Sequence, residues 1–209
     1  MLVVFLIFIY SIILHEIAHG LIAERLGDPT ARLSGRLTLN PISHIDPIMS
    51  ILVPLFLVIS GSPIIFGSAK PVPIDPYNLR NPRKDMGMIG LAGPITNILI
   101  ALFLSLLARI ILSFSPNIII IDVLRTGAQI NIILAIFNLI PIPPLDGGRV
   151  LVAVLPDKYS EVLASVENFG IFIVLFLLLF PSSFFSLQGI VVKISSFIFS
   201  LIFPSFPLT

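Results

Sequence analysis

The chain contains no cysteine, and only 11% of its 209 residues are charged. The absence of cysteine excludes disulfide bonds and any zinc site with thiolate ligands. A bound metal ion would therefore need histidine, aspartate or glutamate, and the chain has only three histidines. The net charge of +1 gives no indication of nucleic-acid binding.

The scarcity of charge also excludes a surface that is covered by water throughout. A soluble domain carries about 25% charged residues, whereas 56% of this chain is hydrophobic and its mean hydropathy is +1.10. Lipid must cover much of the surface, which predicts an integral membrane protein. Residues 1–27 lack the basic start and the small-residue cleavage site of a signal peptide. We therefore expect a retained transmembrane helix there.

Several hydrophobic stretches approach the length of about 20 residues that a bilayer span needs. They are residues 2–24, 86–114, 127–141, 162–180 and 186–203. A further stretch, residues 48–60, is shorter and contains Pro54. It would reach only about 20 Å into a core of about 30 Å, which predicts a short span or a re-entrant segment.

These stretches predict the fold class. We expect an all-α membrane protein, a polytopic helical bundle of about five to six transmembrane segments with a re-entrant or β-like loop after the first helix. The longest polar stretch, residues 61–85, contains five prolines and two glycines, which exclude a regular helix. It is either a connecting loop or a lid that guides substrate.

A metal-binding pattern interrupts the first hydrophobic stretch. His15, Glu16 and His19 form His-Glu-x-x-His, and residues four apart lie on one face of a helix. Both imidazoles can therefore bind one zinc ion, and Glu16 can act as general base on a zinc-bound water. A polar contact between helices is the alternative. It explains neither the spacing nor the cost of about 2.5–3.5 kcal/mol for each charged residue inside a span.

A catalytic zinc usually has a third protein ligand. The candidates are His44, Asp46, Asp146, Glu161 and Glu167. Asp146 is preferred because three prolines between 141 and 144 break the preceding helix, and broken helices at membrane depth line cavities. Taken alone, the same stretch is compatible with an ordinary proline–glycine turn. His44 is interpreted as a loop-stabilising histidine or a group near zinc, and the two glutamates as residues that suit a helix N-terminus.

Two motifs together resemble those of the site-2 protease family of intramembrane zinc proteases. The first is His15 to His19, and the second, Asn138 to Gly147, reads N-x-x-P-x-P-x-L-D-G. Residues 92–94 (Ala-Gly-Pro), followed by Asn97, are similar to the central-span motif of the family. Residues 35–41 and 70–73 are similar to features of its compact prokaryotic members. The resemblance covers roughly residues 10–155 and implies a compact form without PDZ or CBS domains.

The resemblance implies one Zn²⁺ per chain, bound by His15, His19 and Asp146, with Glu16 as catalytic base. Asn138 would hold the substrate carbonyl or the oxyanion. The implied activity is that of a zinc metalloendopeptidase that cleaves membrane proteins in or near their transmembrane segments. Such cleavage serves regulated intramembrane proteolysis or the clearance of signal-peptide remnants. We expect a single domain over residues 1–209, with a catalytic core at about 2–155 and accessory C-terminal helices at about 160–203.

This site constrains the topology. The proposed ligands can meet only if the C-terminal ends of spans 2–24 and 127–141 lie on the same side of the membrane. The chain between these ends must therefore cross the membrane an even number of times. Spans 86–114 and 127–141 supply two crossings, so we expect that 48–60 does not cross fully. One side then carries most of the basic residues: Arg25, Arg32, Arg36, Lys70, Arg80, Arg83, Lys84, Arg149 and Lys158. The positive-inside rule predicts a multi-pass protein of the cell membrane whose active site lies in the bilayer, nearer the cytoplasmic face.

Two other functions stay open. A membrane metal-ion transporter would use the same His/Asp cluster without a general base, and it predicts several ligand sets at different depths. Another type of membrane metalloprotease would take Glu161 or Glu167 as third ligand. The expected partners of a protease are the lipid bilayer and a transmembrane protein or peptide. Because helical carbonyls are shielded, the substrate must unwind, and residues 33–39 are a candidate edge strand to receive it.

Overall fold

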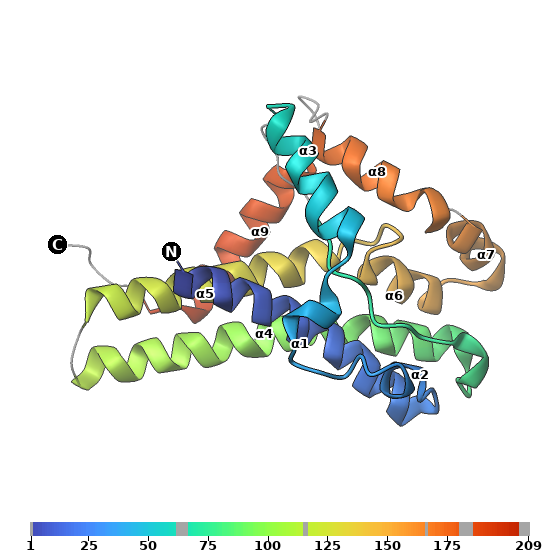
Figure 1. Ribbon diagram of the computed structural model, residues 1–209, viewed down its shortest axis with the longest axis horizontal. Helices are drawn as coiled ribbons and strands as arrows, with labels where there is room; N and C mark the ends of the chain where they lie inside the picture. Colours follow the sequence, from blue (N-terminus) through green and yellow to red (C-terminus); the bar gives the residue numbers. More distant parts are fainter. Residues whose placement is uncertain (1, 62–66, 115–116, 166, 180–185, 205–209) are drawn as a thin grey trace.

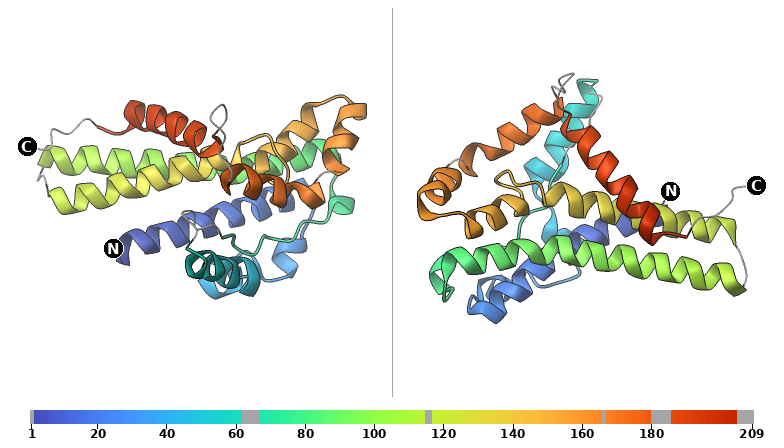
Figure 2. Two further views of the ribbon diagram at one scale, coloured as in Figure 1. Left: turned by 90° about the horizontal axis from the view of Figure 1, so that it is seen from above. Right: turned by 180° about the vertical axis from the view of Figure 1, so that it is seen from behind.

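The computed structural model describes residues 2–61, 67–114, 117–165, 167–179 and 186–204, which form helices and loops without a strand. Three helices are long and apolar enough to cross a membrane: α1 (Leu2–Leu26), α4 (Pro82–Phe114) and α5 (Ile118–Asn138). They lie side by side in Figure 1 and in both views of Figure 2. This arrangement confirms the prediction of an all-α membrane protein.

Small residues allow these helices to approach closely. Ala101 and Ala108 on α4 and Ala128 on α5 are fully buried in the main apolar cluster. Without a hydrophobic driving force in lipid, close backbone packing of this kind holds membrane helices together. Large side chains on the outer face of α4, such as Phe103 and Leu106, are exposed and suited to contact with lipid.

The predicted spans differ from the observed helices in three places. Helix α5 begins at Ile118, nine residues before the predicted start. Asp122 and Arg125 lie near its N-terminal end, where charged side chains are tolerated. The stretch 162–180 is divided between α7 (Asp157–Ser165) and α8 (Glu167–Leu179). Helices α8 and α9 (Leu187–Ile202) have 13 and 16 residues. At about 1.5 Å per residue both are shorter than a core of about 30 Å.

The stretch 48–60 forms a π-helical segment, η2 (Pro47–Leu52), followed by α3 (Val53–Ile59). It projects away from the three long helices in Figure 1 and is seen end-on in the left view of Figure 2. It therefore runs across the direction of α1, α4 and α5 rather than beside them. This orientation agrees with the expectation that 48–60 is not a full crossing.

The segment after α1 contains α2 (Thr30–Leu33) and the short helix η1 (Pro41–His44). The candidate edge strand at 33–39 is wrong. Gly35, at φ 63°, closes α2 with a turn in which the Arg36 N–H donates to the Ala31 carbonyl at 2.9 Å. A backbone used to end a helix in this way is not available as the start of a strand. The remaining short elements are η3 (Pro76–Asn78) and α6 (Asp146–Val154).

Candidate metal centre

Three side chains converge in the interior of the bundle. His15 and His19 lie on α1, with their Nε2 atoms 3.0 Å apart. Asp146, the first residue of α6, places Oδ2 3.1 Å from His15 Nε2 and 3.3 Å from His19 Nε2. All three residues are buried. The i, i+4 spacing within α1 fixes the histidine pair, and the proline-rich turn after α5 brings the carboxylate to it.

The hydrogen bonds around the histidines show which ring nitrogens are free. His15 Nδ1 lies 2.6 Å from Asn97 Oδ1, and His19 Nδ1 lies 2.7 Å from the Ile89 carbonyl oxygen. Both partners accept, so each Nδ1 donates, and an imidazole in the neutral form that a metal ligand requires then directs its Nε2 lone pair inward. Asp146 Oδ2 has no hydrogen-bond donor among the described residues. Three atoms with lone pairs repel one another at these distances unless a cation lies between them. The two imidazole nitrogens and the carboxylate oxygen are therefore suited to bind Zn²⁺.

Gly93 on α4 forms the wall behind the two rings. A Cβ atom at this position would lie 2.5 Å from His15 Nε2 and from His19 Nε2. Real Cβ atoms almost never approach another heavy atom within 3.0 Å. Only glycine therefore leaves room for both imidazoles against α4 in this arrangement.

A cavity of about 330 Å³ opens beside the three side chains. Glu16 lines it, and its Oε2 accepts a hydrogen bond of 2.9 Å from the Val72 N–H. Asn138, at the end of α5, also lines the cavity, and its Nδ2 donates to the Leu134 carbonyl at 3.0 Å. Part of the proline-rich loop forms one wall: Gly67, Ser68, Ala69, Pro71, Val72 and Ile74. The described part of this loop therefore lines the cavity as well as connecting α3 to α4.

Comparison with known proteins gives the family. The family model for peptidase family M50 matches residues 109–181. A Bacillus subtilis protein named "Putative zinc metalloprotease YwhC" is 34% identical over 178 residues, which cover 80% of this chain and 77% of that protein. The chain belongs to peptidase family M50. This membership confirms the resemblance read from the two motifs.

More distant relatives of this M50 chain carry similar names. "Putative zinc metalloprotease Rip2" of Mycobacterium tuberculosis is 31% identical over 176 residues, 82% of this chain and 64% of that protein. "Zinc metalloprotease MJ0392" of Methanocaldococcus jannaschii is 27% identical over 199 residues, 94% of this chain and 47% of that protein. No solved structure matches the chain.

No other described candidate for a third ligand joins the histidine pair of this M50 chain. Asp46 caps η2, where Oδ1 accepts from the backbone N–H groups of Ile48 and Met49. Glu161 is exposed on α7, and the side chain of Glu167 lies outside the described residues. Among the residues that the structure describes, Asp146 alone completes a group of three with His15 and His19.

His44 stabilises a loop. It is buried in η1, and its Nε2 lies 2.8 Å from the Thr38 carbonyl oxygen. The His44 carbonyl in turn accepts from the Lys70 N–H at 2.9 Å. His44 therefore links the segment after α1 to the cavity-lining loop, which agrees with the simpler of its two interpretations.

Two buried polar sites were not predicted from the sequence. One is a polar network of Ser11, Asn97 and Asn131, of which only Asn97 belonged to a recognised motif. A polar residue inside an apolar span is a signal that could have found the other two, because such residues face the bundle interior.

The other missed site is Asp28, which is fully buried just beyond α1. Its carboxylate accepts from the Asp75 N–H at 2.8 Å, from Asn78 Nδ2 at 3.0 Å, and from Thr30. Burial favours the neutral acid, but these hydrogen bonds outweigh it and lower the pKa of Asp28 from its usual value. Asp28 thereby anchors the end of the loop whose preceding residues line the cavity.

Proposed function

We propose that this M50 chain is an intramembrane zinc metalloendopeptidase that hydrolyses peptide bonds in or near the transmembrane segments of membrane proteins. The observation that carries the proposal is the convergence of two imidazole Nε2 atoms and one carboxylate oxygen beside a glutamate-lined cavity. The names of the relatives, which include zinc metalloproteases, support the same chemistry.

In this proposal His15, His19 and Asp146 hold the zinc ion. The metal, when bound, polarises the scissile carbonyl and lowers the pKa of a water molecule. Glu16 accepts a proton from the attacking water and returns it to the leaving nitrogen. The hydrogen bond from the Val72 N–H fixes one oxygen of Glu16 and thereby the orientation of its carboxylate. Asn138 is assigned to the substrate carbonyl because it lines the same cavity.

The substrate segment must be unwound before cleavage, because carbonyl groups in a helix are already hydrogen-bonded. The described part of the proline-rich loop supports recognition of such a segment. Residues 67–75 form neither helix nor strand, and several of them line the cavity. We therefore assign substrate recognition to this loop in place of residues 33–39.

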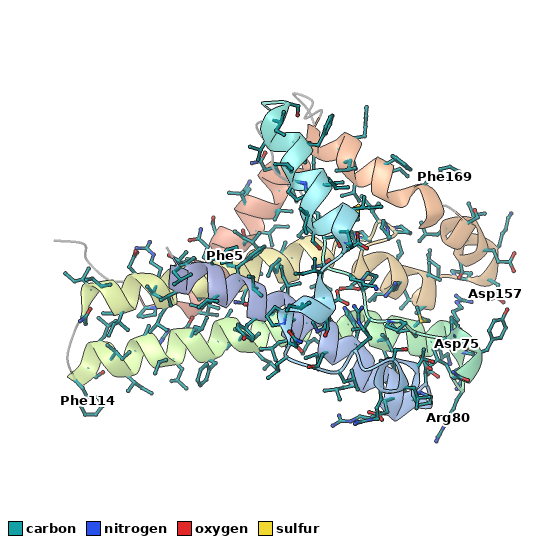
Figure 3. The ribbon with its side chains drawn as sticks, viewed as in Figure 1. Phe5, Asp75, Arg80, Phe114, Asp157 and Phe169 are labelled. Carbon is teal, nitrogen blue, oxygen red and sulfur yellow. The ribbon has the colours of Figure 1, made fainter. Side chains whose placement is uncertain are left out.

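Charged residues support a site nearer the cytoplasmic face of the cell membrane. Figure 3 shows Asp75, Arg80 and Asp157 near the end of the bundle where α4 begins, and Phe114 at the other end of α4. Arg80 is followed by Arg83 and Lys84 at the start of α4, so by the positive-inside rule this end faces the cytoplasm. The proposed catalytic core comprises residues 2–155, and α7 to α9 are accessory helices of the same domain.

A metal-ion transporter fits less well. It would need successive ligand sets along a pathway, and the residues that the structure describes hold one such group. It would also have no use for Glu16 as a base beside that group.

The deciding experiment uses the Glu16→Gln variant. Purified wild-type protein with zinc should cleave a reconstituted transmembrane substrate, and Glu16→Gln should bind zinc equally but lose cleavage, because the ligands remain and the base is gone. In a separate experiment, the inactive variant purified from cells should retain its natural substrates, which would identify them. Cleavage at the wild-type rate by Glu16→Gln would refute the assigned role of Glu16 and, with it, the proposed mechanism.

A further inference from the structure

We propose that Asn131 on α5 is a positioning residue for the metal centre. Through the side-chain amide of Asn97 it determines which ring nitrogen of His15 carries the proton, and so directs the Nε2 lone pair of His15 toward the metal. The consequence for zinc rests on the proposed function. The tautomer of His15, however, is a property of the metal-free protein and can be measured independently.

A chain of hydrogen bonds connects the three long helices. His15 Nδ1 lies 2.6 Å from Asn97 Oδ1, and Asn97 Nδ2 donates to Asn131 Oδ1 at 2.9 Å. Asn131 Nδ2 donates to Ser11 Oγ and to the Gly127 carbonyl, both at 2.9 Å. Asn97 and Asn131 are completely buried. Because both amides are removed from solvent, the hydrogen bonds between them decide their orientations.

The direction of this chain is set by backbone carbonyls, which can only accept. The Gly127 carbonyl requires the Nδ2 end of Asn131, which leaves Asn131 Oδ1 facing Asn97. Asn97 must then offer Nδ2 to Asn131, and this Nδ2 also lies 3.4 Å from the Ser11 carbonyl oxygen. Asn97 Oδ1 is left to face His15, so His15 carries its proton on Nδ1.

The opposite orientation of Asn97 would block the site. An Asn97 amide turned by half a rotation would donate from Nδ2 to His15 Nδ1, and His15 would then carry its proton on Nε2. That proton would point at His19 Nε2 and Asp146 Oδ2, which lie 3.0 and 3.1 Å away. It would occupy the space in which the three donors converge, and His15 could not act as a ligand.

The position of the ring proton is fixed in different ways in the two histidines. His19 Nδ1 bonds directly to the Ile89 carbonyl, which cannot change its role. The tautomer of His15 depends on the orientation of the Asn97 amide, which Asn131 holds by the shorter of its two hydrogen bonds: Asn97 Nδ2 lies 2.9 Å from Asn131 Oδ1 and 3.4 Å from the Ser11 carbonyl oxygen. A purely structural role for Asn131 would disturb both histidines, whereas a positioning role disturbs His15 alone.

The test is ¹⁵N NMR of the imidazoles in metal-free protein in lipid nanodiscs, combined with zinc affinity measured against a chelator. We expect the Nδ1–H form for both histidines in the wild type. In Asn131→Leu, His15 should shift toward the Nε2–H form while His19 stays unchanged. Zinc affinity should fall by about 10- to 100-fold, the usual effect of losing an outer-sphere partner.

Asn131→Asp provides the conservative variant. A protonated carboxyl in this apolar interior donates to the Gly127 carbonyl and accepts from Asn97 Nδ2, so the wild-type tautomer and most of the zinc affinity should return. Ser105→Ala is the matched control. Ser105 is a buried residue on α4 whose Oγ has no hydrogen-bond partner in the described structure, and its loss should change neither measurement.

An unchanged His15 tautomer in folded Asn131→Leu, or an equal shift of both histidines, would overturn the proposal. If Asn131→Leu does not fold, Asn131→Asp decides the question, and a folded Asn131→Asp protein in which His15 carries its proton on Nε2 would overturn it equally. A wild-type protein that shows the expected tautomers but no zinc-dependent cleavage would refute the proposed function and leave the positioning role standing.

Discussion

Gly93→Ala tests the geometry of the metal centre with a single added methyl group. The new Cβ would lie 2.5 Å from His15 Nε2 and His19 Nε2, where ordinary contact begins at 3.4 Å. The closest overlap is with His15 Cε1, at 2.4 Å, and relieving it requires a relative movement of about 1.0 Å. Zinc–ligand distances tolerate only about 0.2 Å. The variant should therefore lose well-formed zinc coordination.

The size of the effect follows from the cost of overpacking, which is about 1–3 kcal/mol. At 1.4 kcal/mol for each factor of ten, zinc affinity should fall by about 5- to 150-fold. The metal-free protein should suffer less, because an imidazole without zinc can turn away from α4. We therefore expect the thermal stability of the metal-free variant to stay close to that of the wild type, while its stabilisation by zinc is much reduced.

Zinc affinity would be measured by chelator competition in detergent, and folding by circular dichroism during heating with and without zinc. Gly189→Ala on α9 is the control, since the nearest heavy atom to its new Cβ would be Ser186 Oγ at 3.3 Å, far from the site. Wild-type zinc affinity in Gly93→Ala would refute the reasoning, because it would mean that the two histidines do not bind metal in the arrangement described.

Three further predictions follow from the structure. Asp146→Asn removes a proposed ligand and should weaken zinc binding by more than about 100-fold, which is the upper limit for losing a group that only supports a ligand. As the control, Asp157→Asn removes only an exposed ion-pair partner and should bind zinc normally. Asp28→Asn should lower the melting temperature at pH 7. Because the pKa of Asp28 is lowered, this difference should persist down to about pH 4 and shrink below it, as the wild-type carboxylate becomes protonated. Cysteines at the exposed positions Arg25 and Lys84 should react with an impermeant reagent from the same side of sealed vesicles; labelling from opposite sides would refute the non-crossing orientation of 48–60.

How much of the site the sequence predicts depends on how local each relationship is. The pairing of His15 with His19 follows from the repeat of one helix and needs no knowledge of the rest of the fold. Asp146 lies far from them in the chain, and five residues competed for its role until the second motif was recognised. Asn131 has no motif at all, and its contact with Asn97 depends on how α4 and α5 are aligned.

The errors in the fold have physical causes of the same kind. Hydropathy predicted a late start for α5 because it counts Asp122 and Arg125 against a span wherever they lie, although charges near a helix end can reach water. Hydropathy also does not report where an apolar stretch bends, so the stretch 162–180 was predicted as one span rather than as α7 and α8. The segment 33–39 contains alternating apolar residues, but the turn at Gly35 uses its backbone to end α2.

The separation of the proposed ligands along the chain has a consequence for synthesis of the protein. His15 and His19 leave the ribosome early, whereas Asp146 follows more than 120 residues later. At about 5–20 residues per second this interval lasts on the order of 10 s. Throughout that time a nascent chain inserted in the membrane carries an incomplete ligand set. Completion of the proposed site is therefore tied to insertion of α4 and α5, and under the proposed function a partly made chain is inactive.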